Sequence, residues 1–238
     1  MHIIYTTRYL LWESEARGEL FSKIEYAPIK DERLAGSIPK LGVTEAVSIL
    51  DKLRSERNEI GSCFNTKSRL TNNNVFYRRG GLYWKVFVDF VTGSSEEKII
   101  NIIAGIDPRS IIAALSSNLW FWYFTSTSDC RHLGRRDIDT FPFDPREMSP
   151  PLYAELCKLG QEYVLDLRRH AGIEVRVYKG NKSVECLSFI VKEAKPIIDK
   201  IDRLLAQHYG FTEEELDFII NYDIKYRMGK DSDEQEES

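Results

Sequence analysis

The stretch that most constrains this chain runs from Ser116 to Phe143, where an aromatic helix end passes into a small-polar and basic segment and then into a Phe-Pro-Phe stop. Asp107 before Pro108 predicts the start of the helix, because an aspartate N-cap accepts unpaired amide protons and proline fits the first helical turn at no hydrogen-bond cost. Apolar residues then recur every four positions, at Ile111, Leu115, Leu119 and Tyr123. This spacing predicts one helix with one buried face, and we interpret the rest of the chain as its support.

The segment after the aromatic residues has a different chemistry. Residues 125–128 offer hydroxyl groups, and the basic side chains that follow are Arg131, His132, Arg135 and Arg136. Hydroxyl and guanidinium donors together are typical of sites that hold phosphate oxygens. The same residues also fit a plainer structure, in which Ser128 or Asp129 caps a short helix and the arginines are solvated on its surface. Composition leaves both interpretations open.

Three segments carry a resemblance to a known family. They are SSNLWFWYF with SDCRHLGRRDIDTFPF (116–143), FYRRGGLYWKVF with GSSEEK (76–98), and HYGFTEEELDFIINYDIKYRMG (208–229). Taken in the order in which they occur along the chain, they resemble the C-terminal target-recognition region of adenine-specific DNA methyltransferases of the TaqI type. The resemblance is strongest to the fused restriction-modification enzymes called type IIG, and weakest over residues 1–40.

The resemblance implies sequence-specific recognition of double-stranded DNA in a restriction-modification system, with catalysis elsewhere. No glycine-rich loop after a strand is present to hold S-adenosylmethionine. Residues 149–152 resemble the motif that holds a flipped adenine, but they lack its stacking aromatic residue, and we interpret them as a helix start. S-adenosylmethionine and Mg²⁺ are therefore expected in a methyltransferase or endonuclease partner, or in domains outside this chain. The start at Met1, near the interior of the family's domain, favours a fragment of a larger enzyme over a separate specificity subunit.

A β-hairpin is predicted around Gly80–Gly81, because a two-residue primed turn requires positive φ and aromatic or β-branched runs flank these glycines. Such a turn pairs Tyr77 with Trp84 and Phe76 with Lys85. It would place cations and flat apolar surface together on one face, made of the following residues: Phe76, Arg78, Tyr83 and Lys85. This face suits a DNA backbone or base edges. An ordinary amphipathic hairpin covering a core remains the alternative.

The predicted contacts divide into two kinds. Those expected on phosphates are Lys85, Arg131, His132, Arg135 and Arg136, and the candidates for base contacts are Arg78, Arg79 and Asn72–Asn74. If about six phosphates are neutralised, affinity should fall roughly a thousandfold between 50 and 200 mM salt.

A glycine-serine segment follows the predicted second strand. Small hydroxyls at Ser94 and Ser95 beside Gly93 can let backbone amides approach a phosphate, although the same residues make any turn. The nearby Asp89, Glu96 and Lys98 imitate the acid and lysine pattern of Mg²⁺-dependent nucleases. A Mg²⁺-dependent nuclease is therefore the less favoured alternative function, because no further carboxylate on a predicted strand accompanies these three residues.

The charge of the chain is unevenly distributed. The net charge of -4 equals the sum over residues 230–238, which contain one lysine and five acids, so the rest of the chain is neutral.

Four scattered cysteines indicate neither a disulfide framework nor a zinc site, and no metal-ligand set is predicted. No apolar run reaches the roughly 20 residues of a membrane span. We therefore expect a cytoplasmic protein that contacts DNA and no membrane.

These patterns together predict an α+β fold. Residues 1–148 are expected to form the DNA target-recognition core, with a mixed or antiparallel sheet, hairpins and the central aromatic helix. Residues 149–229 are expected to form a C-terminal helical hairpin with a small β-hairpin, and 230–238 a disordered acidic tail. In the helical hairpin, Gly210 is the predicted end of the first helix, and Thr212 with Glu215 forms a predicted capping box at the start of the second. An alternative function is an assembly module, in which Trp120, Phe121 and Trp122 form an exposed patch that docks a methyltransferase subunit.

Overall fold

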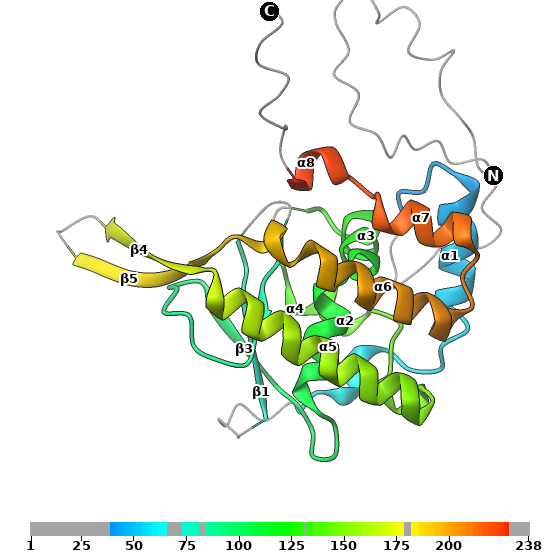
Figure 1. The fold of residues 1–238 in the computed structure, drawn as a ribbon, viewed down its shortest axis with the longest axis horizontal. Helices are drawn as coiled ribbons and strands as arrows, with labels where there is room; N and C mark the ends of the chain where they lie inside the picture. The colour runs from blue at the N-terminus through cyan, green and yellow to red at the C-terminus, as the bar shows by residue number, and fades with distance from the viewer. Residues whose placement is uncertain (1–38, 66–72, 81–83, 131, 179–181, 229–238) are drawn as a thin grey trace, which may run out of the picture.

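The chain adopts an α+β fold in the computed structural model, which describes residues 39–65, 73–80, 84–130, 132–178 and 182–228 (Figure 1). The predicted strands before residue 39, the loop 66–72, and the acidic tail lie outside these residues. The helices are α1 (Thr44–Leu53), α2 (Pro108–Ser116), α3 (Asn118–Thr127), α4 (Arg135–Asp139), α5 (Pro150–Arg169), α6 (Lys195–Tyr209), α7 (Glu213–Ile220) and α8 (Ile224–Met228). The strands are β1 (Asn74–Arg78), β2 (Phe87–Val88), β3 (Glu97–Asn101), β4 (Ala171–Tyr178) and β5 (Lys182–Phe189). No helix in this part of the chain has the length and apolar content to cross a membrane.

The predicted central helix is two helices. Its start is confirmed, because the Asp107 carboxylate accepts the backbone N–H of Arg109 at 2.9 Å. The uninterrupted course is wrong, because Ser117 has an extended backbone (φ -68°, ψ 157°) and its hydroxyl oxygen accepts the N–H of Trp120 at 2.9 Å. Ser117 therefore acts as the N-cap of a second helix, α3.

Helix α3 lies at the centre of the molecule (Figure 1). Trp120 and Trp122 are 1% and 0% exposed. Phe87 of β2 meets the Trp120 ring edge-on at 5.1 Å, and Phe218 of α7 meets Trp122 at 6.4 Å. The predicted docking patch of Trp120, Phe121 and Trp122 is wrong, because the sheet and the C-terminal helices cover these rings.

The three-stranded sheet has the order β2-β1-β3, with both pairings antiparallel. Phe76 pairs with Val88 and Tyr77 with Phe87, so the pairs expected from a two-residue turn at Gly80–Gly81 are wrong. The partner of Phe76 lies three positions further along than predicted, at residue 88 in place of 85. An odd shift exchanges the two faces of a strand, so the segment before β2 turns Lys85 toward the core. Residues 81–83, with the predicted site residue Tyr83, lie outside the described chain.

One hydrophobic core contains residues from both sides of the predicted boundary at residue 148, which itself stays a prediction. Helix α5 packs on α2 (Figure 1), and Gly160 of α5 lies against the carbonyl oxygen of Arg109. A side chain at position 160 would meet the backbone of α2 well inside contact distance, so glycine is required for the approach of the two helices.

Gly160→Ala is expected to destabilise the protein by roughly 2 kcal/mol, because overpacking against a backbone atom outweighs the better helix propensity of alanine. Urea unfolding monitored by tryptophan fluorescence measures the change. Lys158→Ala is the control, since Lys158 is exposed on the same helix and pairs only with Glu155 at 3.2 Å. Equal stability of the two variants would contradict the described packing.

The C-terminal part follows its local sequence signals. Gly210 ends α6 with φ 67°, and Thr212 and Glu215 form the predicted capping box, with the Thr212 N–H donated to Glu215 at 2.7 Å. The predicted second β-hairpin is present as β4 and β5, which project from the body as a two-stranded ribbon (Figure 1).

Arg227 of α8 is buried between the rings of Trp84 and Phe121, at 3.9 and 4.3 Å from their centroids. Its role is structural.

Candidate nucleic-acid interface

The basic segment after α3 folds into a loop and the short helix α4. The Asp137 carboxylate accepts the backbone N–H of Gly134 at 2.7 Å and so caps α4 at its start. The plainer interpretation expected a short helix with solvated arginines, and α4 is such a helix. Its start is capped by Asp137, from within its first turn, and not by Ser128 or Asp129. Arg135 and Arg136 both lie on α4 and are exposed.

This loop is held at the C-terminal end of α3. Lys40 Nζ donates to the carbonyl oxygen of Ser128 at 2.6 Å and to that of Thr125 at 3.4 Å, a favourable place for a cation because helix C-termini carry partial negative charge. Cys130 adopts a left-handed φ of 61°, and its N–H bonds to the Ser128 hydroxyl at 3.0 Å. The loop therefore has a defined shape.

The end of strand β1 meets this loop. The backbone N–H of Leu133 donates to the carbonyl oxygen of Arg79 at 3.1 Å, which brings the end of β1 beside the residues that lead into α4. Four exposed basic side chains from the two segments form what we call the arginine cluster: Arg79, His132, Arg135 and Arg136. The structure thus brings together four of the predicted DNA-binding residues.

The ion pair of Arg135 in this cluster is exposed. Arg135 Nε bonds to Asp139 at 2.5 Å and stacks over Phe64 at 4.8 Å, but the pair is 41% and 36% exposed. An exposed pair of this kind is worth about 0.2–1 kcal/mol, so a phosphate can replace the carboxylate. Burial raises the pKa of Tyr77, whereas the positive charges of Arg135 and Arg79 lower it.

A pocket of about 290 Å³ adjoins the cluster. Its lining includes the predicted residues Ser128, His132 and Arg136, together with Asp129 and Asp137. Burial raises the pKa of the Asp137 carboxyl, which also accepts the Gly134 N–H. Because Asp129 and Asp137 share this pocket with His132 and Arg136, its lining is not uniformly positive.

Two predicted cations do not join the cluster. Lys85 is 5% exposed, with Nζ at 5.2 Å from the Phe124 ring, and burial lowers its pKa. Its predicted phosphate contact is wrong, since the ammonium group faces the core. Arg78 donates to the Thr92 hydroxyl at 3.2 Å and to the Leu187 carbonyl, and it stacks over Phe189 at 5.6 Å. Arg78 therefore fastens β5 to the sheet, and we withdraw it as a base reader.

The glycine-serine segment, residues 93–95, also lies where β5 meets the three-stranded sheet. Gly93 has φ 78°, and a Cβ there would lie 2.7 Å from the carbonyl oxygen of Glu185. Glycine is thus required for the approach of β5. The Ser94 hydroxyl accepts the N–H of Glu96 at 3.3 Å, and Ser95 is exposed. Contacts of Ser94 and Ser95 with DNA stay predictions, as does that of Arg131, which lies outside the described residues.

The nuclease pattern does not assemble. Lys98 lies on β3 opposite Tyr77 of β1, while Asp89 follows β2 on the other side of β1 and bonds to Arg168 at 3.1 Å. Two strand spacings, roughly 10 Å, separate the acid from the lysine. Among the described side chains, no three of the types His, Cys, Asp and Glu gather where they could hold a metal ion.

Sequence reasoning missed the role of Lys40, which lies 88 positions from Ser128 and has no local signal. It also missed β3, because no strand was predicted over residues 97–101. Asn73, a candidate for base contact, donates its amide to the carbonyls of Ile103 and Ile106 at 3.3 and 3.0 Å, so it supports the loop before α2.

Comparisons of the chain with protein-family models, with curated proteins and with solved structures found no match.

Proposed function

We propose that this chain is a double-stranded DNA recognition domain of a restriction-modification enzyme of the type IIG or adenine-N6 methyltransferase kind. It would work in the cytoplasm, beside a methyltransferase or endonuclease domain or subunit that binds S-adenosylmethionine and Mg²⁺. The observation that carries this proposal is the arginine cluster, in which the exposed Arg79, directly after β1, is tied through its backbone to the loop that leads into the exposed arginines of α4. The resemblance of three ordered segments to target-recognition regions supports it.

The cluster suggests a division of labour. His132, Arg135 and Arg136 follow one another along the loop and α4, which suits successive phosphates of one strand. Arg79 ends β1 beside them and is the remaining arginine candidate for a base contact, since guanine presents two acceptors that match a guanidinium fork. The half-buried Arg78 and the buried Lys85 would act indirectly, by holding the sheet against β5 and α3.

Arg135→Ala combined with Arg136→Ala is expected to weaken binding to every duplex alike, by roughly tenfold, because phosphate contacts carry no sequence information. Fluorescence anisotropy with a labelled duplex of random sequence and with a duplex selected for tight binding measures both affinities. Lys158→Ala combined with Lys200→Ala is the matched control, because it removes the same charge from the exposed surfaces of α5 and α6.

The two double variants separate a local site from a general effect of charge. If both lose the same affinity, binding depends only on net charge. If neither loses affinity, or if the wild-type chain does not bind duplex DNA, the proposed function is wrong.

A further inference from the structure

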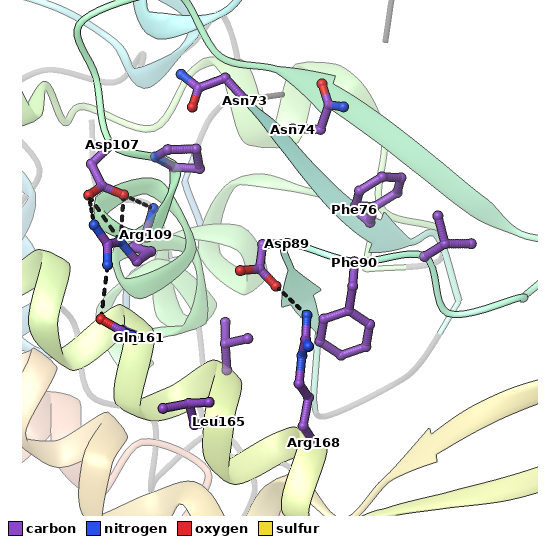
Figure 2. A pocket seen from close by; sticks show the side chains of 13 residues that line it. Asn73, Asn74, Phe76, Asp89, Phe90, Asp107, Arg109, Gln161, Leu165 and Arg168 are labelled. Carbon is purple, nitrogen blue, oxygen red and sulfur yellow. Dashed lines mark hydrogen bonds and ion pairs between the residues drawn. The ribbon is translucent and has the colours of Figure 1, made fainter. Parts of the chain in front are cut away.

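A second pocket, of about 620 Å³, contains no residue of the arginine cluster. It lies between β1 and residues 89–91 on one side and the start of α2 with α5 on the other (Figure 2). Its volume falls within the range of roughly 300–1,000 Å³ that is typical of small-molecule sites. None of the proposed DNA contacts uses it.

The charged groups of this pocket neutralise one another. Asp89 bonds to Arg168 at 3.1 Å, and Asp107 bonds to Arg109 Nε at 2.8 Å (Figure 2). The two acids and two arginines sum to zero, and each carboxylate already has its cation. The pocket therefore has no excess charge with which to select a phosphate, a carboxylate or a metal ion, and it favours an uncharged ligand.

One wall of the pocket is a flat stack. The Arg168 guanidinium lies over the Phe90 ring at 4.1 Å, and its side chain is 52% exposed, so its outer side is open to a ligand. Planar guanidinium groups and aromatic rings are the surfaces on which nucleobases stack in proteins. Phe76 adds a second ring to the lining.

A hydrogen-bonding group lies on α5 seven residues before Arg168, in the lining of the same pocket. Arg109 donates to Gln161 Oε1 at 2.9 Å, which fixes the orientation of the Gln161 amide. The amide nitrogen donates to no group in the described part of the chain. At the rim, Val91 and Leu165 are 63% and 50% exposed, apolar surface that a bound ring would cover.

We infer that this pocket binds a nucleobase, stacked on Arg168 and hydrogen-bonded at its edge to Gln161. An uncharged flat ring with donors and acceptors along one edge matches both walls. The base can come from a free nucleoside or from an unpaired position in a duplex, and the second source rests on the proposed function.

The test uses the full chain and 2-aminopurine fluorescence. One arm titrates the protein into 2-aminopurine riboside. The other compares two duplexes that differ only in whether the 2-aminopurine is paired with thymine or placed in a single-nucleotide bulge. The variants are Arg168→Ala, which removes the stacking plane, and Leu165→Trp, which fills the mouth from a half-exposed position. Arg169→Ala is the control, because this arginine is exposed, follows Arg168 on the same helix and does not line the pocket.

We expect saturable binding of the riboside, or a bulged duplex bound at least about tenfold more tightly than the paired one, lost in both pocket variants and kept in Arg169→Ala. Riboside binding alone identifies a free nucleoside as the source, and a bulge preference alone identifies DNA. The inference is overturned if neither occurs, or if binding survives in both pocket variants. Failure of the proposed function appears separately, as loss of paired-duplex binding, and it leaves the riboside arm intact.

Discussion

Asp202→Ala is expected to lower the free energy of unfolding by about 4 kcal/mol, because it removes the largest favourable charge interaction of the buried Arg227. Asp202 and Arg227 are 2% and 5% exposed. Burial raises the pKa of Asp202 to about 6 and lowers that of Arg227 to about 10, so both groups are charged at pH 7. Urea unfolding monitored by circular dichroism measures the loss.

The large effect has a second cause, because Asp202 also caps α3. Its carboxylate accepts the backbone N–H groups of Leu119 and Asn118 at 3.0 and 3.2 Å, and the Asn118 amide at 2.6 Å. Arg227 in turn donates to the Asn118 side-chain oxygen. Removal of Asp202 thus leaves amide groups unpaired in the interior, at the helix that the aromatic core surrounds.

Two further variants separate this explanation from a general loss of charge. Glu155→Ala removes an exposed carboxylate of α5 that pairs with Lys158 at 3.2 Å, and it should cost about 1 kcal/mol or less. Arg227→Met added to Asp202→Ala should recover part of the stability, because the unpaired buried charge is gone. If the added Arg227→Met costs as much as it does alone, the two residues are not coupled.

The affinity of the wild-type chain for duplex DNA is expected to fall by roughly a hundredfold between 50 and 200 mM salt. This corresponds to about four neutralised phosphates, because the burial of Lys85 leaves four of the five predicted phosphate contacts: Arg131, His132, Arg135 and Arg136. Fluorescence anisotropy at a series of salt concentrations yields the slope of the logarithm of affinity against the logarithm of salt concentration.

The slope should distinguish the exposed cations from the buried one. Arg135→Ala with Arg136→Ala should reduce its magnitude by roughly 2, whereas Lys85→Met should leave it unchanged. A slope near zero in the wild-type chain would remove the electrostatic basis of the proposed interface. A change of slope in Lys85→Met would show that the Lys85 ammonium group reaches DNA although it is buried in the structure.

Local signals predicted the ends of several helices. Asp107, Gly210 and the Thr212 capping box act within one helical turn, and each behaves in the structure as its sequence predicted. The strands of the second hairpin were found for the same reason, since the alternation of their side chains is a local property.

The sequence by itself determined the α+β class, the helix boundaries set by local caps, and the presence of a basic segment after an aromatic helix. Only the tertiary structure decided the register of β1 with β2, the burial of Lys85 and Trp120, and the meeting of Arg79 with α4. Cap and turn preferences depend on neighbours along the chain, and are therefore visible in the sequence. Which face of a strand is buried depends on what distant segments pack against it, and a register shift of an odd number of residues reverses that face at little local cost.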